Sequence, residues 1–184
     1  MKTMFKPLGV AAAVAAVTAG YAGVSSAAEV SARNVGDLAL VPYYTVRSGF
    51  ATGVHIINTT NLTQTVKVRA RRGSDSMDSL DFNLIMSPKD EWVGSLTQRE
   101  DGVIVFRTDD NTCTAPKASA TGTPGVTEFI MPDDTSIETE IDFRTGAEEG
   151  YIEVIGMGQI DGQFAGYYAK HVNGVPRDCA KVRE

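Results

Sequence analysis

Short runs in which apolar and polar residues alternate recur along most of the chain, and Gly, Pro, Asn and Asp interrupt them. Alternation with a period of two is typical of a β-strand that has one face in the core and the other in water. The clearest run is residues 66–71. Its Val66, Val68 and Ala70 face one way, and three basic side chains face the other. No sustained 3.6-residue pattern with helix caps is seen, so the chain predicts an all-β domain.

The other strand candidates are short and are bounded by turn-forming residues. They cover residues 54–57, 80–86, 91–93, 103–106, 128–131, 137–143, 151–157 and 164–172. Residues 103–106 are continuously apolar, which favours a strand buried on both faces. Polar turn residues 58–61 predict a hairpin that joins strands 54–57 and 66–71, and Gly162 predicts a second hairpin. Eight or nine strands at this spacing favour an antiparallel β-sandwich, Ig-like or jelly-roll-like, over a barrel.

The segment between the predicted strands at 103–106 and 128–131 has a different composition. Residues 109–125 are rich in Thr, Ala, Ser, Pro and Gly, and they predict a long loop. Gly156 and Gly158 fall inside the strand at 151–157, where isolated glycines usually mark a β-bulge or a hairpin.

The N-terminus has the order of a secretory signal. Lys2 and Lys6 precede an apolar stretch at residues 8–22, and small residues follow at 25–28. This order predicts a signal peptide over residues 1–28, cleaved after Ala28. The stretch is rich in Ala and Gly and is shorter than a membrane-spanning helix. We therefore expect an exported product, in the periplasm, at the outer surface or outside the cell, with residues 29–184 forming one domain.

The charge balance limits the kind of partner. The chain has 17 Lys+Arg and 23 Asp+Glu, for a net charge of −6. Removal of the leader takes away two lysines, which leaves 15 basic and 23 acidic residues and a net charge of −8. Nucleic acids and anionic membranes are bound through clustered Lys and Arg, so neither is expected as a partner.

Two cysteines are present, Cys113 and Cys179. An even number of cysteines in an exported chain predicts a disulfide, and the pair lies in no C-x-x-C or metal-ligand spacing. The alternative is two unrelated buried thiols.

Catalytic signatures are missing from the sequence. His55 and His171 are the only histidines, and no nucleophile elbow, zinc-binding helix or phosphate-binding loop accompanies them. We predict no catalytic residues, and we read His55 as a strand residue that faces water or is satisfied in a pocket.

Carboxylates cluster at three places that could supply oxygen ligands to calcium. The clusters are Asp75, Asp78 and Asp81; Asp109 and Asp110 with Asn111; and Asp133 and Asp134 with Glu138. None has the spacing of a calcium-binding loop, and Asp and Asn favour turns for backbone reasons alone. We therefore expect solvated turns, with calcium as the one candidate cofactor. Cross-strand pairing with the first cluster is also expected for the basic stripe at Arg69, Arg71 and Arg72.

Aromatic residues suggest a second kind of surface. In a strand, adjacent residues point to opposite faces, so the pairs Tyr43–Tyr44 and Tyr167–Tyr168 should each place one ring in the core and one outside. An exposed row that included Tyr43 or Tyr44 and Trp92 could stack on sugars, but core filling with a single surface tyrosine is the favoured interpretation.

Several segments resemble a group of exported, cell-surface-type proteins of Gram-negative bacteria. The most specific part is residues 36–46, which read GDLALVPYYTV. The similarity continues through residues 57–59, 66–69, 80–88 with Trp92, and 150–154 to Cys179. The group has no settled activity, so the resemblance implies an envelope or surface location and no catalytic residues. Its members often continue past the Cys179 position, so the resemblance implies either a short paralogue or a domain truncated at its C-terminus.

The leading expectation is a non-enzymatic structural or adhesive module that binds a protein partner, or itself, through an edge strand. A calcium-assisted carbohydrate-binding module is the second expectation. A glycoside hydrolase with an acid pair is the third.

Overall fold

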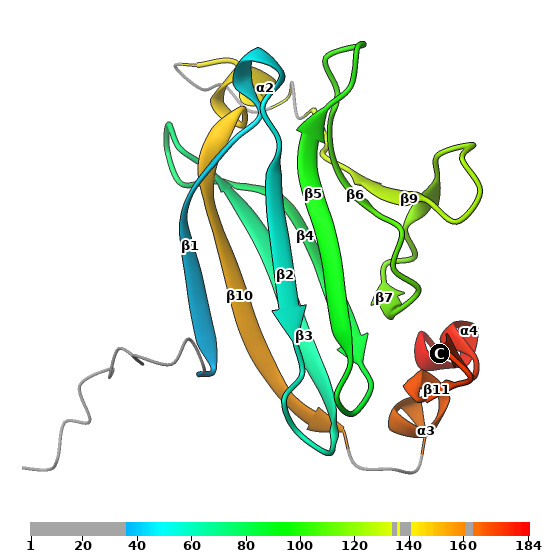
Figure 1. Cartoon of the computed structure of the whole chain (residues 1–184). Coiled ribbons are helices and arrows are strands. Elements are labelled where there is room, and N and C mark those ends of the chain that lie inside the picture. The colour runs from blue at the N-terminus through cyan, green and yellow to red at the C-terminus, as the bar shows by residue number, and fades with distance from the viewer. Residues whose placement is uncertain (1–35, 134–135, 137–140, 161–163) are drawn as a thin grey trace, which may run out of the picture. The chain divides into compact units, whose positions relative to one another are not determined.

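Two antiparallel sheets of five strands each make up most of the structure, a computed structural model (Figure 1). It describes residues 36–133, 136, 141–160 and 164–184, which all belong to the unit Val35–Glu184. The predicted signal peptide lies outside the described residues.

Sheet A has the strand order β1-β10-β3-β4-β7, and sheet B has the order β2-β5-β6-β9-β8. The strands of sheet A are β1 Leu38–Thr45, β10 Glu149–Ile160, β3 Thr63–Arg72, β4 Asp78–Met86 and β7 Cys113–Ala115. Those of sheet B are β2 Thr52–Ile57, β5 Glu91–Gln98, β6 Ile104–Thr108, β9 Thr127–Ile130 and β8 Ser119–Ala120. The smaller elements are a hairpin of β11 His171–Val172 with β12 Val175–Pro176, and the short helices η1 Arg47–Gly49, α2 Phe143–Gly146, α3 Ala165–Ala169 and α4 Cys179–Val182. The predicted all-β, antiparallel fold is confirmed.

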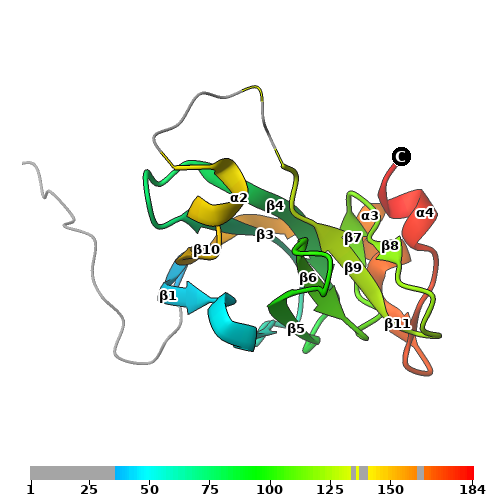
Figure 2. The same cartoon turned by 90° about the horizontal axis from the view of Figure 1, so that it is seen from above.

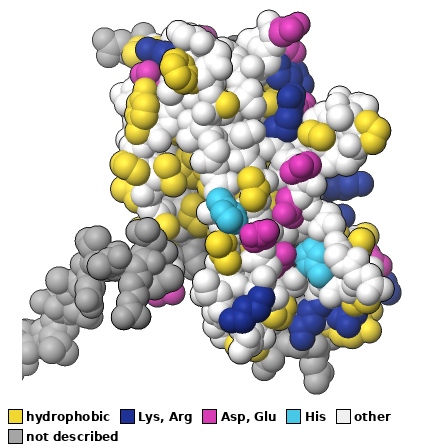
Figure 3. Space-filling view, in the orientation of Figure 1, with side chains coloured by type: hydrophobic (Ala, Val, Ile, Leu, Met, Phe, Trp, Pro, Cys, Tyr) yellow, Lys and Arg dark blue, Asp and Glu magenta, His cyan; other side chains and the backbone are white. Residues whose placement is uncertain are grey.

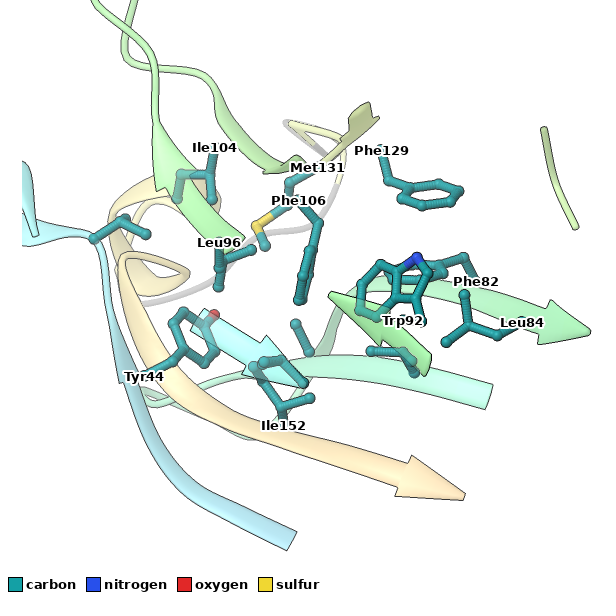
Figure 4. Close-up of a cluster of buried hydrophobic side chains, with 14 of the residues drawn as sticks. Tyr44, Phe82, Leu84, Trp92, Leu96, Ile104, Phe106, Phe129, Met131 and Ile152 are labelled. Carbon is teal, nitrogen blue, oxygen red and sulfur yellow. The ribbon is translucent and has the colours of Figure 1, made fainter. Parts of the chain in front are cut away.

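The two sheets, seen from above in Figure 2, enclose the main core, whose side chains are shown in close-up in Figure 4. Phe82 from β4 stacks on Phe129 from β9, with ring centroids 3.8 Å apart and planes 6° apart. Phe106 from β6 meets Phe82 edge-on at 5.5 Å and also contacts Trp92 from β5 at 5.4 Å. Because these rings come from both sheets, the core joins the two layers of a β-sandwich. Ile104, Val105 and Phe106 are all buried, so the strand predicted to be buried on both faces is confirmed.

The predicted hairpin between residues 54–57 and 66–71 is wrong. β2 pairs with β5 in sheet B, while β3 pairs with β4 and β10 in sheet A. Asn58 lies where the chain crosses between the sheets, and its buried amide donates to Leu62 O at 2.8 Å and Ser87 O at 2.7 Å. Residues 58–61 therefore change the direction of the chain, as predicted, but they link the two sheets and do not close a hairpin.

Two predicted strands are also wrong in the described residues. Residues 164–172 form helix α3 followed by the two-residue strand β11. Phe143 begins helix α2, whose N-cap Asp142 accepts a hydrogen bond from Thr145 N at 3.0 Å. Helices of four and five residues are too short to show a 3.6-residue pattern. Residues 137–140 and the hairpin predicted at Gly162 lie outside the described residues.

The predicted loop at 109–125 contains β7 and β8, so it is only partly irregular. The bulge predicted at Gly156 and Gly158 is confirmed, because the pairing of β10 with β3 shifts register between them.

The disulfide between Cys113 and Cys179 is present. It joins β7, at one end of sheet A, to helix α4 in the C-terminal segment. Around it lies a second small core of Ile85, Cys113 and Ala169. The bond therefore attaches the C-terminal segment, residues 164–184, to the sandwich.

Candidate interaction edge

Strand β1 is one edge of sheet A. A single contact shows which of its residues hydrogen-bond to β10 and which direct their backbone groups outward. Gly156 N donates to Asp37 O at 2.7 Å, which makes this pair a hydrogen-bonded one. Opposite residues of an antiparallel pair alternate between hydrogen-bonded and non-hydrogen-bonded. Leu38 and Leu40 therefore belong to non-hydrogen-bonded pairs, and their N–H and C=O groups point away from β10. In the described part of the chain, no strand lies on that side of β1.

The side chains of this edge are apolar and exposed. Leu38 is 62% exposed and Leu40 is 59% exposed. Natural edge strands usually discourage pairing with lysines, prolines or inward-pointing charges. Residues 38–45 carry no charge, and Pro42 is the one such device among them. Hydrophobic side chains gather on the side of the molecule where β1 lies (Figure 3). This edge can therefore accept a further strand.

The other edge strands of the two sheets offer less backbone for a further strand to pair with. β7 has three residues, and Arg183 beside helix α4 donates to Thr114 O of β7 at 3.0 Å. β8 has two residues. β2 is the other edge of sheet B, and its exposed His55 lies 3.2 Å from the Glu91 carboxylate. His55 thus faces water, as predicted, and β1 is the longest of the edge strands.

The outer face of sheet A beside this edge is a ladder of ion pairs. Arg71 contacts Asp78 at 2.7 Å and Glu153 at 2.9 Å, and Lys67 contacts Asp81 at 2.7 Å. The hydrogen bond from Lys67 lowers the pKa of Asp81, and the hydrogen bond to Glu153 raises the pKa of Arg71. The predicted pairing of the basic stripe with neighbouring acids is therefore present, and these charges are largely matched within the sheet.

An open pocket of about 490 Å³ lies where β1 approaches the start of β10. Tyr43 and Tyr151 line it together with Arg47, Ser74 and Glu149. The Tyr43 hydroxyl donates to Glu149 Oε1 at 2.9 Å, and Arg47 Nη1 lies 3.5 Å from Glu149 Oε2. Two aromatic rings and a paired cation and anion thus share one concave surface.

The exposed row of Tyr43 or Tyr44 with Trp92 does not form, because Trp92 is buried in the core. Tyr44 and Trp92 are fully buried, so neither ring can stack on a ligand. Burial raises the pKa of Tyr44 to about 12, and its hydroxyl donates to Ala147 O at 2.9 Å. Tyr43 is 57% exposed, so that pair divides between core and surface as expected. Tyr167 and Tyr168 lie on helix α3, so strand alternation does not apply to them.

Tyr151, Arg47 and Glu149 were missed as pocket residues. Glu149 lies 106 residues from its hydrogen-bond partner Tyr43, and no local motif links them. Only the pairing of β1 with β10 brings them together.

His171 sits in a polar cluster beside the disulfide. Its Nδ1 lies 2.6 Å from Ser87 Oγ, and its Nε2 lies 2.8 Å from Asn111 Oδ1. Asp90 Oδ2 is 3.6 Å from Nδ1. A serine nucleophile must be open to substrate, whereas Ser87 is 4% exposed. The contacts connect the C-terminal hairpin to the β4–β5 turn, and we read the cluster as structural.

The predicted carboxylate clusters pair with cations or cap turns. Asp75 contacts buried Arg72 at 3.1 Å, and Asp133 contacts Arg144 at 2.9 Å. Asp110 Oδ1 accepts from Thr112 N at 2.7 Å. Asp134 and Glu138 lie outside the described residues. Within the described ranges, no three His, Cys, Asp or Glu side chains are grouped to hold a metal ion.

No family model, curated protein or solved structure matches this chain in the comparisons made. Among the residues that the structure describes, none of the helices has the length and apolar character needed to cross a membrane.

Proposed function

We propose that this protein is an exported, non-enzymatic interaction module of the cell envelope or surface, and that it binds a protein partner by adding a strand to β1. One observation carries the proposal. The backbone N–H and C=O groups of Leu38 and Leu40 point away from β10, on an edge strand that has no charged side chain. In β-augmentation, backbone hydrogen bonds supply affinity and alternate side chains supply specificity. The secretory order of the N-terminus and the resemblance to cell-surface-type proteins support the location.

Site-specific photo-crosslinking in intact cells tests this role. The full chain carries a photoreactive phenylalanine analogue at Leu40, and a control chain carries it at exposed Ser119 on β8, an edge strand of the other sheet. We expect a discrete, light-dependent protein adduct from position 40 and at least severalfold less from position 119. Equal adducts from both positions, or none from position 40, would contradict a docking role for β1.

The pocket supports a second candidate function, the binding of a saccharide. Aromatic faces pack on sugar rings, and charged groups arranged around a concave site can bind hydroxyls. Tyr43, Tyr151, Arg47 and Glu149 supply both kinds of group. This candidate keeps the carbohydrate-binding expectation but moves it to a different set of residues and requires no calcium.

An array of immobilised oligosaccharides tests the pocket. If a glycan binds the wild-type protein, Tyr43→Ala should weaken that binding about tenfold or more, because one stacking ring and its hydrogen bond to Glu149 are lost. Phe164→Ala is the matched control, since Phe164 is 61% exposed and does not line the pocket. An equal loss in both variants, or no bound glycan on the array, would count against this function.

A further inference from the structure

We propose that the strand added to β1 is β1 of a second copy of this chain, paired antiparallel about a two-fold axis at Ala39. This inference rests on the proposed function of β1 as a docking edge, and it names the partner. The pairing would join two copies of sheet A into one continuous sheet of ten strands.

The residues on either side of Ala39 are identical. Leu38 and Leu40 flank it, and both direct their backbone N–H and C=O groups to the open side. When Leu38 of one copy lies opposite Leu40 of the other, each pair exchanges two backbone hydrogen bonds. The two-fold axis creates this pair twice, so four hydrogen bonds satisfy all the outward groups of these residues. A single short segment therefore acts as both donor and acceptor strand, as an isologous interface requires.

Pro42 favours this register over its neighbour. If Leu40 lay opposite Leu40 of the second copy, Pro42 would lie opposite Leu38, and proline has no N–H to donate. The pairing of β1 with β10 is also irregular between Val41 and Tyr44, which ends the regular edge at that point. An axis at Leu38 would place Leu40 opposite Gly36, where its side chain would have no apolar neighbour. The axis at Ala39 keeps the contact within residues 37–41.

The charges near the edge are compatible with this arrangement. Asp37 would lie opposite Val41, so the two Asp37 side chains would be separated by about 14 Å along the strands. The nearby cations on the outer face are matched by Asp78, Asp81 and Glu153. The leucines of the two copies would therefore meet without like charges directly opposite. A contact this short belongs to the weak, reversible class of interfaces.

A cysteine at the axis tests the geometry directly. Ala39 would form a non-hydrogen-bonded pair with its own copy, at a Cα–Cα distance of about 4.5 Å that a disulfide can span. Leu38 would lie about 8–9 Å from its own copy, beyond that range. We therefore expect Ala39→Cys to form a covalent dimer on mild oxidation of the purified chain. Leu38→Cys and Leu40→Cys should each stay monomeric alone, yet cross-link when mixed.

Leu40→Pro tests the hydrogen bonds in solution. The Leu40 N–H points away from β10, so a proline there leaves the internal pairing of the sheet intact and removes two of the four intermolecular bonds. Sedimentation velocity should show a concentration-dependent wild-type dimer. Its dissociation constant should rise about thirtyfold in the variant, while the melting temperature stays nearly unchanged. The native Cys113–Cys179 bond is checked by mass in every cysteine variant.

Two outcomes separate this inference from the proposed function. If the wild type is monomeric at high concentration and Ala39→Cys cross-links no faster than Leu38→Cys, self-pairing is wrong. An adduct from position 40 in cells that contains a different protein then keeps β1 as a docking edge. If the position-40 adduct has twice the mass of the chain and contains only its own peptides, both proposals are supported.

Discussion

Replacing Cys113 and Cys179 together by alanine should lower the free energy of unfolding by about 4 kcal/mol. The two residues are separated by 66 positions, and a cross-link of that span removes a large amount of conformational entropy from the unfolded chain. Domains of this size are usually stable by only about 5–15 kcal/mol, so the loss is a large part of the total. Urea unfolding of the oxidised wild type and the double variant measures it.

The loss should begin in the C-terminal segment. Besides the disulfide, the Ser87–His171–Asn111 contacts and the bond from Arg183 to Thr114 O hold this segment to the sandwich. Asn111→Ala is a suitable control, because it removes only two exposed hydrogen bonds, to Gly174 O and with His171 Nε2, and should cost about 1–2 kcal/mol. Hydrogen exchange in the double variant should increase first in residues 164–184. A double variant within 1 kcal/mol of the wild type would show that the other contacts suffice.

The pattern of the sequence predicts strands better than it predicts their partners. Val66, Val68 and Ala70 alternate because one face of β3 is buried, and this local property is visible in the residues. Which strand lies beside β3 depends on a chain crossing at Asn58 and on β10, about 80 residues away along the chain. A polar turn looks the same whether it joins neighbouring strands or links two layers, and for this reason the predicted hairpin was wrong.

The sequence predicted the type of candidate site, an edge strand, but not which residues form it. Edge-strand binding was an expectation for any antiparallel sandwich, yet Leu-Ala-Leu-Val at residues 38–41 has the composition of a buried strand. The strand order shows that both leucines lie at an edge, and the bond from Gly156 N to Asp37 O shows that their backbone groups point outward. Likewise, the pocket joins Tyr43 to Glu149 across 106 residues. The Cys113–Cys179 bond was predictable because two cysteines allow a single intrachain pairing.

Phe82→Ala should destabilise the fold by about 3–5 kcal/mol, since it opens a cavity at the point where the two sheets meet. Phe82 is 2% exposed, stacks on Phe129 at 3.8 Å and contacts Phe106 edge-on. Thermal and urea unfolding should both report the loss.

Leu40→Ala is the matched control for Phe82→Ala, and it connects stability with function. Leu40 is 59% exposed on the same sheet, so its truncation should change the free energy of unfolding by less than about 0.5 kcal/mol. Two large apolar side chains of sheet A would then differ several-fold in their contribution to folding. A cost for Leu40→Ala close to that of Phe82→Ala would show that the β1 edge is packed within the monomer and is not free to bind. A small cost leaves the exposed leucines without a structural role in the monomer, as expected of a surface whose contacts form with a partner.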